Sequence, residues 1–159
     1  MKGKNELNSS WSYLCNLRNL RIYSAFRIGP MQHPKLEALT RQDARYAYEA
    51  YEFVFAALAH TLAMMGKAEE ETHVSGRQLL GGVRDLAQRE FGLMARTVFR
   101  LWGIDRTADF GEIVFNLVEA GLMNKTDRDD RADFADVYDL DEALARDYRI
   151  ELPPDPEDR

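Results

Sequence analysis

Histidine and cysteine are the first candidates for chemistry, because their side chains bind metal ions and act as bases or nucleophiles. The chain has three histidines and one cysteine. His60 and His73 are separated by thirteen positions, and neither has a further histidine or cysteine at the short spacing of a zinc site. Cys15 has no identifiable activating base. We therefore predict no metal site, no cofactor and no catalytic residue from these side chains.

Carboxylates gather late in the chain, and carboxylate oxygens are the ligands that calcium prefers. The aspartates concerned are Asp127, Asp129, Asp130, Asp133, Asp136, Asp139 and Asp141. The stretch lacks the glycine and the terminal glutamate spacing of an EF-hand loop. The sequence favours a solvated acidic face, and it leaves open whether residues 127–142 bind a cation. Phosphate-binding loops and the GxSxG motif are absent from the sequence, which gives no signature of an enzyme.

Two pairs of arginines are the candidate partner-binding residues. Arg77 and Arg84 are seven positions apart in one expected helix, and Arg96 and Arg100 are four apart in the next. These spacings place each pair on one helix face, and the two pairs could combine into one basic patch. One interpretation is a solvated face. The other is a surface that docks an acidic partner segment, or this chain's own acidic C-terminal region.

The elements that must position these arginines are three consecutive helices between residues 73 and 123. Ser75 and Gln78 have the spacing of a capping box, so the first helix should begin at Gly76, and it should end at Gly92. The paired glycines at 81 and 82 are best explained by close packing against a neighbour. A cap at Thr107 should begin the third helix, which should end at Gly121.

The second helix of this group is expected over residues 93–102. Its buried side should carry Met94, Val98, Leu101 and Trp102, which recur at helical spacing. A longer helix is expected over residues 44–65, after a lead-in that starts at residue 34. Apolar side chains surround most of this helix, so it should lie at the centre, with a thin outer side made of Glu49, Glu52, Ala56 and His60.

The pattern changes after Gly121. Residues 122–126 and 132–140 could pair as a short β-hairpin around a DRDD turn. A capping signature at Asp139 and Glu142 then predicts a short helix through residue 147. The sequence thus predicts a mainly α, single compact domain of about five helices. With a hairpin after the helices, the order of elements is also faintly similar to a winged helix.

Length and charge set the domain boundaries. At 159 residues and 45% hydrophobic content, the chain suits one domain, which we place at residues 31–150. Residues 1–30 hold five basic and one acidic side chain and are interpreted as an unpacked N-terminal extension, and residues 151–159 as a flexible acidic tail. The lone cysteine suits a reducing compartment, and no apolar run approaches the roughly 20 residues of a membrane span. We therefore expect a cytoplasmic protein that is not bound to a membrane.

Several motifs occur together in a fixed order: DARYAYEAYEFVFAAL, HVSGRQLL, FG followed by TVFRLWGI, and DFGEIVFNLVEAGLM with the later DFADVYDL. In these motifs the chain resembles a family of small uncharacterised bacterial proteins, first catalogued from a methanotrophic verrucomicrobial genome, over about residues 35–150. The resemblance implies no activity, cofactor or partner. It does imply that such proteins begin near Met31, which agrees with a dispensable extension before that residue.

A small helical protein-interaction module or adaptor without catalytic activity is the function that these observations favour, with another protein as the partner. The alternatives are a winged-helix-like DNA-binding regulator and an enzyme with a dispersed site. DNA is disfavoured because the chain carries a net charge of −6. It is disfavoured further because the helix that would enter the major groove points carboxylates outward, on a face formed by Asp109, Glu112, Asn116 and Glu119. The oligomeric state is left open.

Overall fold

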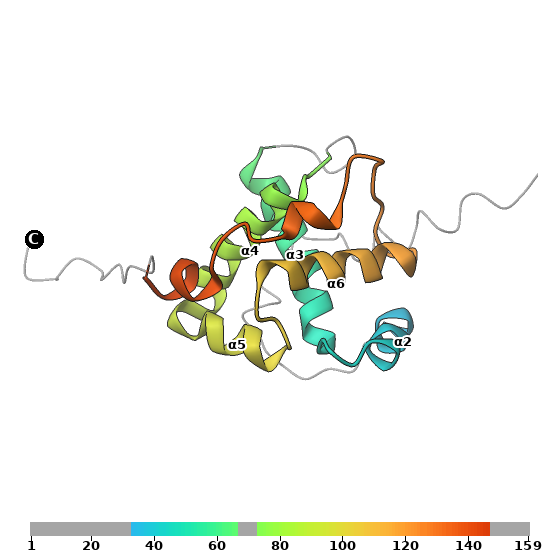
Figure 1. Ribbon diagram of the computed structural model, residues 1–159, viewed down its shortest axis with the longest axis horizontal. Coiled ribbons are helices and arrows are strands. Elements are labelled where there is room, and N and C mark those ends of the chain that lie inside the picture. The colour runs from blue at the N-terminus through green and yellow to red at the C-terminus, as the bar shows by residue number, and fades with distance from the viewer. Residues whose placement is uncertain (1–32, 67–72, 147–159) are drawn as a thin grey trace, which may run out of the picture.

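The computed structural model describes residues 33–66 and 73–146, and the regular elements in this part of the chain are all helices, joined by loops (Figure 1). Its α-helices are α2 (Pro34–Gln42), α3 (Tyr48–Met64), α4 (Gly76–Phe91), α5 (Ala95–Leu101) and α6 (Thr107–Glu119). Short 3₁₀ turns form η2 (Gly92–Met94) and η3 (Arg131–Phe134), and a π-helical turn forms η4 (Glu142–Arg146). The prediction of a mainly α domain of about five helices is confirmed. The expectations for residues 1–30 and 151–159 fall outside the described residues.

The long helix α3 lies at the centre, as its apolar circumference predicted. It packs along α4, and α6 crosses it in Figure 1. Side chains on several sides of α3 are fully buried, among them Ala50, Tyr51, Val54 and Ala57. The helix begins at Tyr48 rather than at residue 44, because Asp43 ends α2 and accepts hydrogen bonds from the backbone and side chain of Arg45.

Close packing between α3 and α4 depends on Gly82. A Cβ added there would overlap the Thr61 hydroxyl on α3 and would lie 3.2 Å from the Ala57 carbonyl oxygen. The neighbouring Gly81 is different, because an added Cβ would meet no atom within 4 Å. The explanation that the sequence suggested for this glycine pair therefore holds for Gly82 alone.

Helix starts were predicted with mixed success. The capping box of α4 is confirmed: the Gln78 N–H donates to Ser75 Oγ at 3.4 Å, and the Ser75 N–H donates to Gln78 Oε1 at 2.9 Å. The predicted Thr107 cap of α6 is wrong. Thr107 is the first residue of the helix and is buried, and the Asp109 carboxylate accepts the N–H of Arg106 at 2.9 Å instead.

The predicted β-hairpin after Gly121 is wrong, since no strand occurs in the described part of the chain. Phe134 provides the physical reason. Its side chain is buried where α4 begins and α6 passes, and a Cβ atom added at Gly76 or Gly111 would come within 2.9 Å of an atom of that side chain. The Val137 N–H donates to Thr107 Oγ1 at 3.3 Å, so this segment bonds to α6 rather than to a partner strand.

His60 was expected on the outer side of the long helix, and this prediction is wrong. Its side chain is 10% exposed and lies between α3 and α4, where Nε2 is 2.6 Å from Asp85 Oδ2. Asp85 also accepts from Arg89 Nε at 2.7 Å. His73 lies elsewhere, with Nε2 3.2 Å from Asp129 Oδ1. Within residues 33–66 and 73–146, no three histidine, cysteine or acidic side chains are grouped as metal ligands.

Candidate functional site

Arg96 and Arg100 of α5 converge on one carboxylate, Asp141, which lies just before η4. Arg96 Nε and Arg100 Nη2 are 2.9 and 3.0 Å from Asp141 Oδ1. The hydrogen bond from Arg96 is the main reason why the pKa of Asp141 is lower than usual. Arg96 is only 12% exposed and also donates to the Ile104 carbonyl at 3.0 Å. This pair therefore binds the chain's own acidic C-terminal region, which is one of the two interpretations of the sequence.

The other arginine pair lies on α4. Arg77 is exposed, whereas Arg84 is half-buried beside Tyr138. The Tyr138 hydroxyl donates to the Leu80 carbonyl at 2.8 Å. Burial raises the pKa of the Tyr138 phenol, and the positive charge of Arg84 opposes that rise. Arg84 thus lies against the segment that follows η3, and a role for Arg77 and Arg84 in binding a partner stays a prediction.

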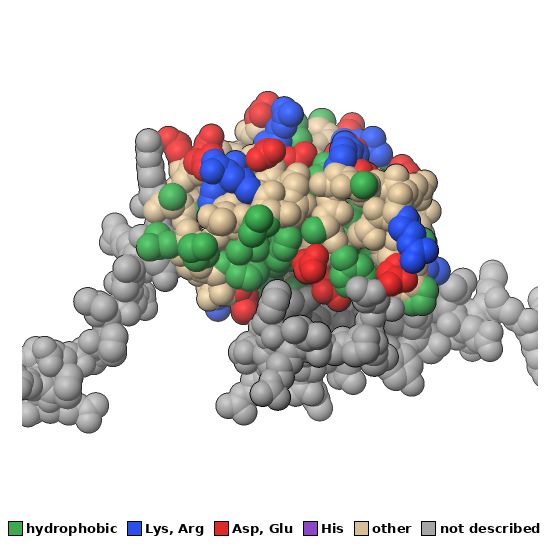
Figure 2. Space-filling view, turned by 90° about the horizontal axis from the view of Figure 1, so that it is seen from below, with side chains coloured by type: hydrophobic (Ala, Val, Ile, Leu, Met, Phe, Trp, Pro, Cys, Tyr) green, Lys and Arg blue, Asp and Glu red, His purple; other side chains and the backbone are tan. Residues whose placement is uncertain are grey.

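The apolar face of α5 differs from the sequence prediction. Leu101 and Met94, expected on the buried side, are 77% and 58% exposed, and Leu93 is 59% exposed. The buried side is instead formed by Ala95 and Phe99, each one residue later than the expected Met94 and Val98, and by Trp102, which was expected there and is half-buried. We call Leu93, Met94 and Leu101 the α5 patch. In Figure 1 α5 lies at the lower left, and Figure 2, seen from below, shows hydrophobic side chains gathered over that half of the face.

A layer of aromatic rings from α3, α4 and α5 holds the buried side of α5 in place. The ring centroid of Phe53 lies 5.8 Å from that of Phe91, 5.4 Å from that of Phe99 and 5.5 Å from that of Trp102. Aromatic rings at these distances prefer offset or edge-to-face arrangements to a face-to-face stack, so the contacts restrict how the rings can lie. Because these rings fill the space beneath α5, the residues of the α5 patch have no room to turn inward.

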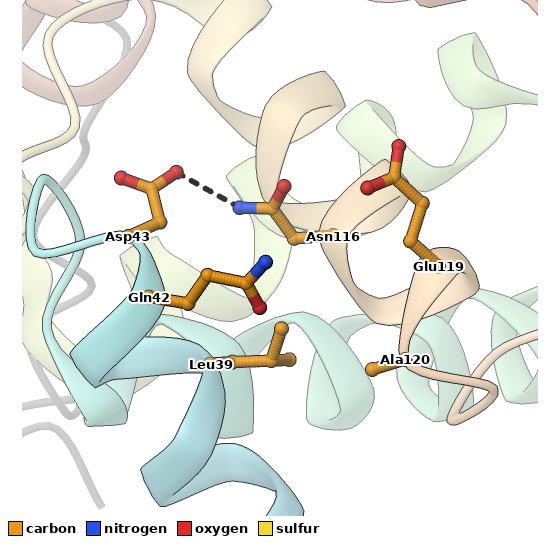
Figure 3. Close-up of a pocket in the computed structure, with 6 residues that line it drawn as sticks. All are labelled: Leu39, Gln42, Asp43, Asn116, Glu119 and Ala120. Carbon is orange, nitrogen blue, oxygen red and sulfur yellow. Dashed lines mark hydrogen bonds between the residues drawn. The ribbon is translucent and has the colours of Figure 1, made fainter.

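A second candidate is a pocket of about 450 Å³ between α2 and the end of α6 (Figure 3). Its lining residues are Leu39, Gln42, Asp43, Asn116, Glu119 and Ala120. In Figure 3 the Asn116 amide points toward Asp43 and donates to its Oδ2 at 3.0 Å. The same amide donates to the Tyr51 hydroxyl at 3.2 Å. Two carboxyl side chains in one pocket are the minimum that acid–base catalysis by paired carboxyls would need.

Asp43 is unsuited to that chemistry. Arg45 Nε donates to Asp43 Oδ1 at 2.9 Å and Arg45 Nη2 donates to Asp43 Oδ2 at 2.7 Å, so both carboxylate oxygens accept hydrogen bonds. The hydrogen bond from Arg45 is the main reason why the pKa of Asp43 falls to about 2. Asp43 therefore stays ionised near neutral pH. The other carboxylate, Glu119, is 69% exposed and lies 3.4 Å from Arg131 Nη2, so the pocket offers fixed hydrogen-bonding groups rather than a proton relay.

Replacing Asp43 with asparagine should lower the free energy of unfolding at pH 7 by roughly 1–2 kcal/mol. A carboxyl with a lowered pKa adds stability above its ordinary value of 3.8, and this stability is lost as the pH falls toward about 2. Urea unfolding of both proteins should therefore give curves that differ at pH 7 and converge between pH 4 and 2. Asp105→Asn, at a side chain 76% exposed, is the matched control and should change little. A gap that stays constant down to pH 2 would contradict this account.

The polar face of α6 was expected to point into solvent, and for most of its residues this is wrong. The Tyr46 hydroxyl donates to Asp109 Oδ1 at 3.1 Å, and Asn116 bonds to Asp43 and Tyr51. The connection between α2 and α3 therefore covers this face. Its members Asp109, Glu112 and Asn116 are half-buried, and Glu119 alone among the four is exposed.

No helix in the described ranges combines the length and hydrophobicity that a membrane span requires. Comparisons with protein-family models, with curated proteins and with solved structures found no match. The assignment of a function therefore depends on the geometry of the two candidate sites.

Proposed function

We propose that this protein is a small helical interaction module that binds another protein through the α5 patch. The observation that carries the proposal is the exposure of three large hydrophobic side chains on η2 and α5, each more than half exposed, above a packed aromatic layer. Exposed apolar side chains that are grouped, rather than scattered singly, mark interaction surfaces. A rigid base beneath them limits the entropy that is lost on binding.

The chemistry around the α5 patch indicates the kind of partner. Arg100 directly precedes Leu101, is 58% exposed and already contacts one carboxylate. Methionine and arginine are both enriched in protein interfaces, where an apolar centre is surrounded by a polar rim. The partner segment should therefore present two or more large apolar side chains next to carboxylates.

The two alternative functions have less support. A DNA-reading role for α6 would require its polar face to be free, and the α2–α3 connection occupies most of it. A catalytic role for the pocket between α2 and α6 would require a carboxyl able to exchange protons, and Arg45 keeps Asp43 ionised. A cytoplasmic location remains part of the proposal and rests on the single cysteine.

Selection of short peptides from a random display library against the full chain tests this function. Enriched peptides should combine large apolar residues with aspartate or glutamate, and fluorescence anisotropy should measure micromolar binding. Leu101→Asp should weaken that binding by at least about tenfold, because it places a charge where apolar contact is needed.

Met64→Asp is the matched control for this selection. Met64 is also a large hydrophobic side chain, 56% exposed, but it ends α3, at the edge of the molecule opposite α5 in Figure 1. Peptides that lose affinity equally with both substitutions, or that bind the Leu101→Asp protein as tightly as the unchanged one, would refute the α5 patch as the binding surface.

A further inference from the structure

The last described element is η4, and it lies beside the α5 patch. η4 packs against η2, α4 and α5, and η2 carries Leu93 and Met94. Leu140, Ala143 and Leu144 are buried, and Gln88 Nε2 donates to the Ala143 carbonyl at 2.8 Å, so the position of η4 is fixed. Any residues that directly follow Arg146 therefore start next to the exposed hydrophobic side chains.

The sequence that follows has a pattern suited to this surface. In residues 147–152, Tyr148, Ile150 and Leu152 alternate with charged residues. An extended segment with this alternation has its three apolar side chains on one side. At about 3.3–3.6 Å per residue, the stretch from 148 to 152 spans roughly 13–14 Å. This is comparable to the roughly 10 Å that the seven residues of α5 cover at 1.5 Å each.

The charge of the segment that follows η4 also complements the arginines of α5. Residues 147–159 hold five acidic and two basic side chains. Arg96 and Arg100 already bind Asp141, a carboxylate of the same acidic region, at 2.9 and 3.0 Å. Further carboxylates that follow η4 would approach the same two cations at short range, where attraction is strongest.

We infer that residues 147–152 of this chain dock in extended form on the α5 patch, with Tyr148, Ile150 and Leu152 against Leu93, Met94 and Leu101. The inference rests on the proposed function, because it concerns the same surface. It adds a way of regulating partner binding there. The chain's own segment occupies the surface, and a partner segment with more apolar contact displaces it. Since the segment is tethered, it competes at an effective concentration in the millimolar range.

A synthetic peptide of residues 147–159, labelled with fluorescein, tests the docking. The full chain carrying Tyr148→Ser, Ile150→Ser and Leu152→Ser should bind it with a dissociation constant of about 100 µM. The unchanged chain should bind it 10–100 times more weakly, because its own segment competes. Adding Leu101→Asp to the triple variant should abolish binding, and adding Met64→Asp should not. Equal binding by the triple variant and the unchanged chain would overturn the inference.

Photocrosslinking identifies the occupant directly. Thr97 is exposed on α5 between Met94 and Leu101, so a benzoylphenylalanine placed there in the full chain should react with whatever covers the patch. Mass spectrometry should find the crosslink at residues 147–152 of the same molecule. A crosslink to residues 1–32, or to a ¹⁵N-labelled second copy in a mixed sample, would overturn the inference and name another occupant.

The two proposals fail in different ways. If library peptides bind through Leu101 but the 147–159 peptide does not bind the triple variant, the docking inference is wrong and the interaction module stands. If the 147–159 peptide binds as expected but library peptides bind the Leu101→Asp protein as tightly as the unchanged one, the α5 patch binds only this chain's own segment. The proposed function is then wrong.

Discussion

Replacing Gly103 with alanine should lower the free energy of unfolding by about 2–5 kcal/mol. Gly103 follows α5 with a φ of 82°, in the left-handed region, which costs an L-residue about 1–2 kcal/mol. A Cβ at this position would also overlap the carbonyl oxygen of Arg45. Because that oxygen belongs to the backbone, it cannot rotate aside as a side chain does. The forced shift adds about 1–3 kcal/mol.

The backbone near Gly103 is also fixed by hydrogen bonds. The Ala47 N–H donates to the Trp102 carbonyl at 3.1 Å, which ties the α2–α3 connection to the turn after α5. The Ile104 carbonyl on the other side accepts from Arg96. If the backbone shifted at Gly103 or at Arg45, these hydrogen bonds would be strained. One of them holds Arg96 of α5 in place.

Gly121→Ala is the matched control. Gly121 has a φ of 67°, but an added Cβ would meet no atom within 4 Å. This substitution should therefore cost only the backbone term of about 1–2 kcal/mol. Urea unfolding at constant m-value measures both changes. Equal losses at the two glycines would show that the approach of Arg45 places no constraint on Gly103.

Local sequence signals predicted the helices well because helix ends are determined by nearby residues. The Ser75–Gln78 capping box and the stops after α4, α5 and α6 need no knowledge of the rest of the chain. The central position of α3 followed from its apolar circumference in the same way. Errors at helix starts, such as Thr107, occurred where a side chain farther along the helix, Asp109, supplied the cap.

The prediction failed where distant contacts decide the conformation. Residues 122–140 have hairpin spacing, but Phe134 fits against two glycines, Gly76 and Gly111, that lie 58 and 23 positions earlier. No local pattern reveals such a fit. The polar face of α6 reads as solvent-exposed for the same reason, because the groups that cover it, Asp43 and Tyr46, precede it by more than 60 positions.

The candidate site was predicted in part. The four-residue spacing of Arg96 and Arg100 correctly placed them on one face. The acidic C-terminal region that contains Asp141 was one of the partners considered for this pair, beside a separate acidic segment and a solvated face. The exposed α5 patch was missed. A signal for it exists in the sequence, because residues 91–102 hold more large apolar side chains than one face of so short a helix can bury, and some of them must be exposed.

The largest loss of stability from a single side chain is expected at Phe110. Phe110 is fully buried on α6, and its ring meets that of Phe99 edge to face, with centroids 5.3 Å apart. Through Phe99 it touches the aromatic layer beneath α5, so it joins α6 to the base of the α5 patch. Phe110→Ala should lower the free energy of unfolding by about 3–5 kcal/mol, since it leaves a cavity in a well-packed core.

Phe115→Ala provides the comparison on the same helix. Phe115 is only half-buried, and Arg131 and Lys125 lie over its ring at 5.0 and 5.7 Å from the centroid. Its loss removes partly exposed surface and two exposed cation–π contacts, which should cost about 1–2 kcal/mol.

Urea unfolding measures the stability of both variants, and peptide binding adds a second readout. Because Phe110 supports α5, binding through Leu101 should weaken in Phe110→Ala even under conditions where that protein is fully folded, and should persist in Phe115→Ala. Losses of stability that are equal at the two positions would mean that the buried and solvent-facing sides of α6 are assigned wrongly.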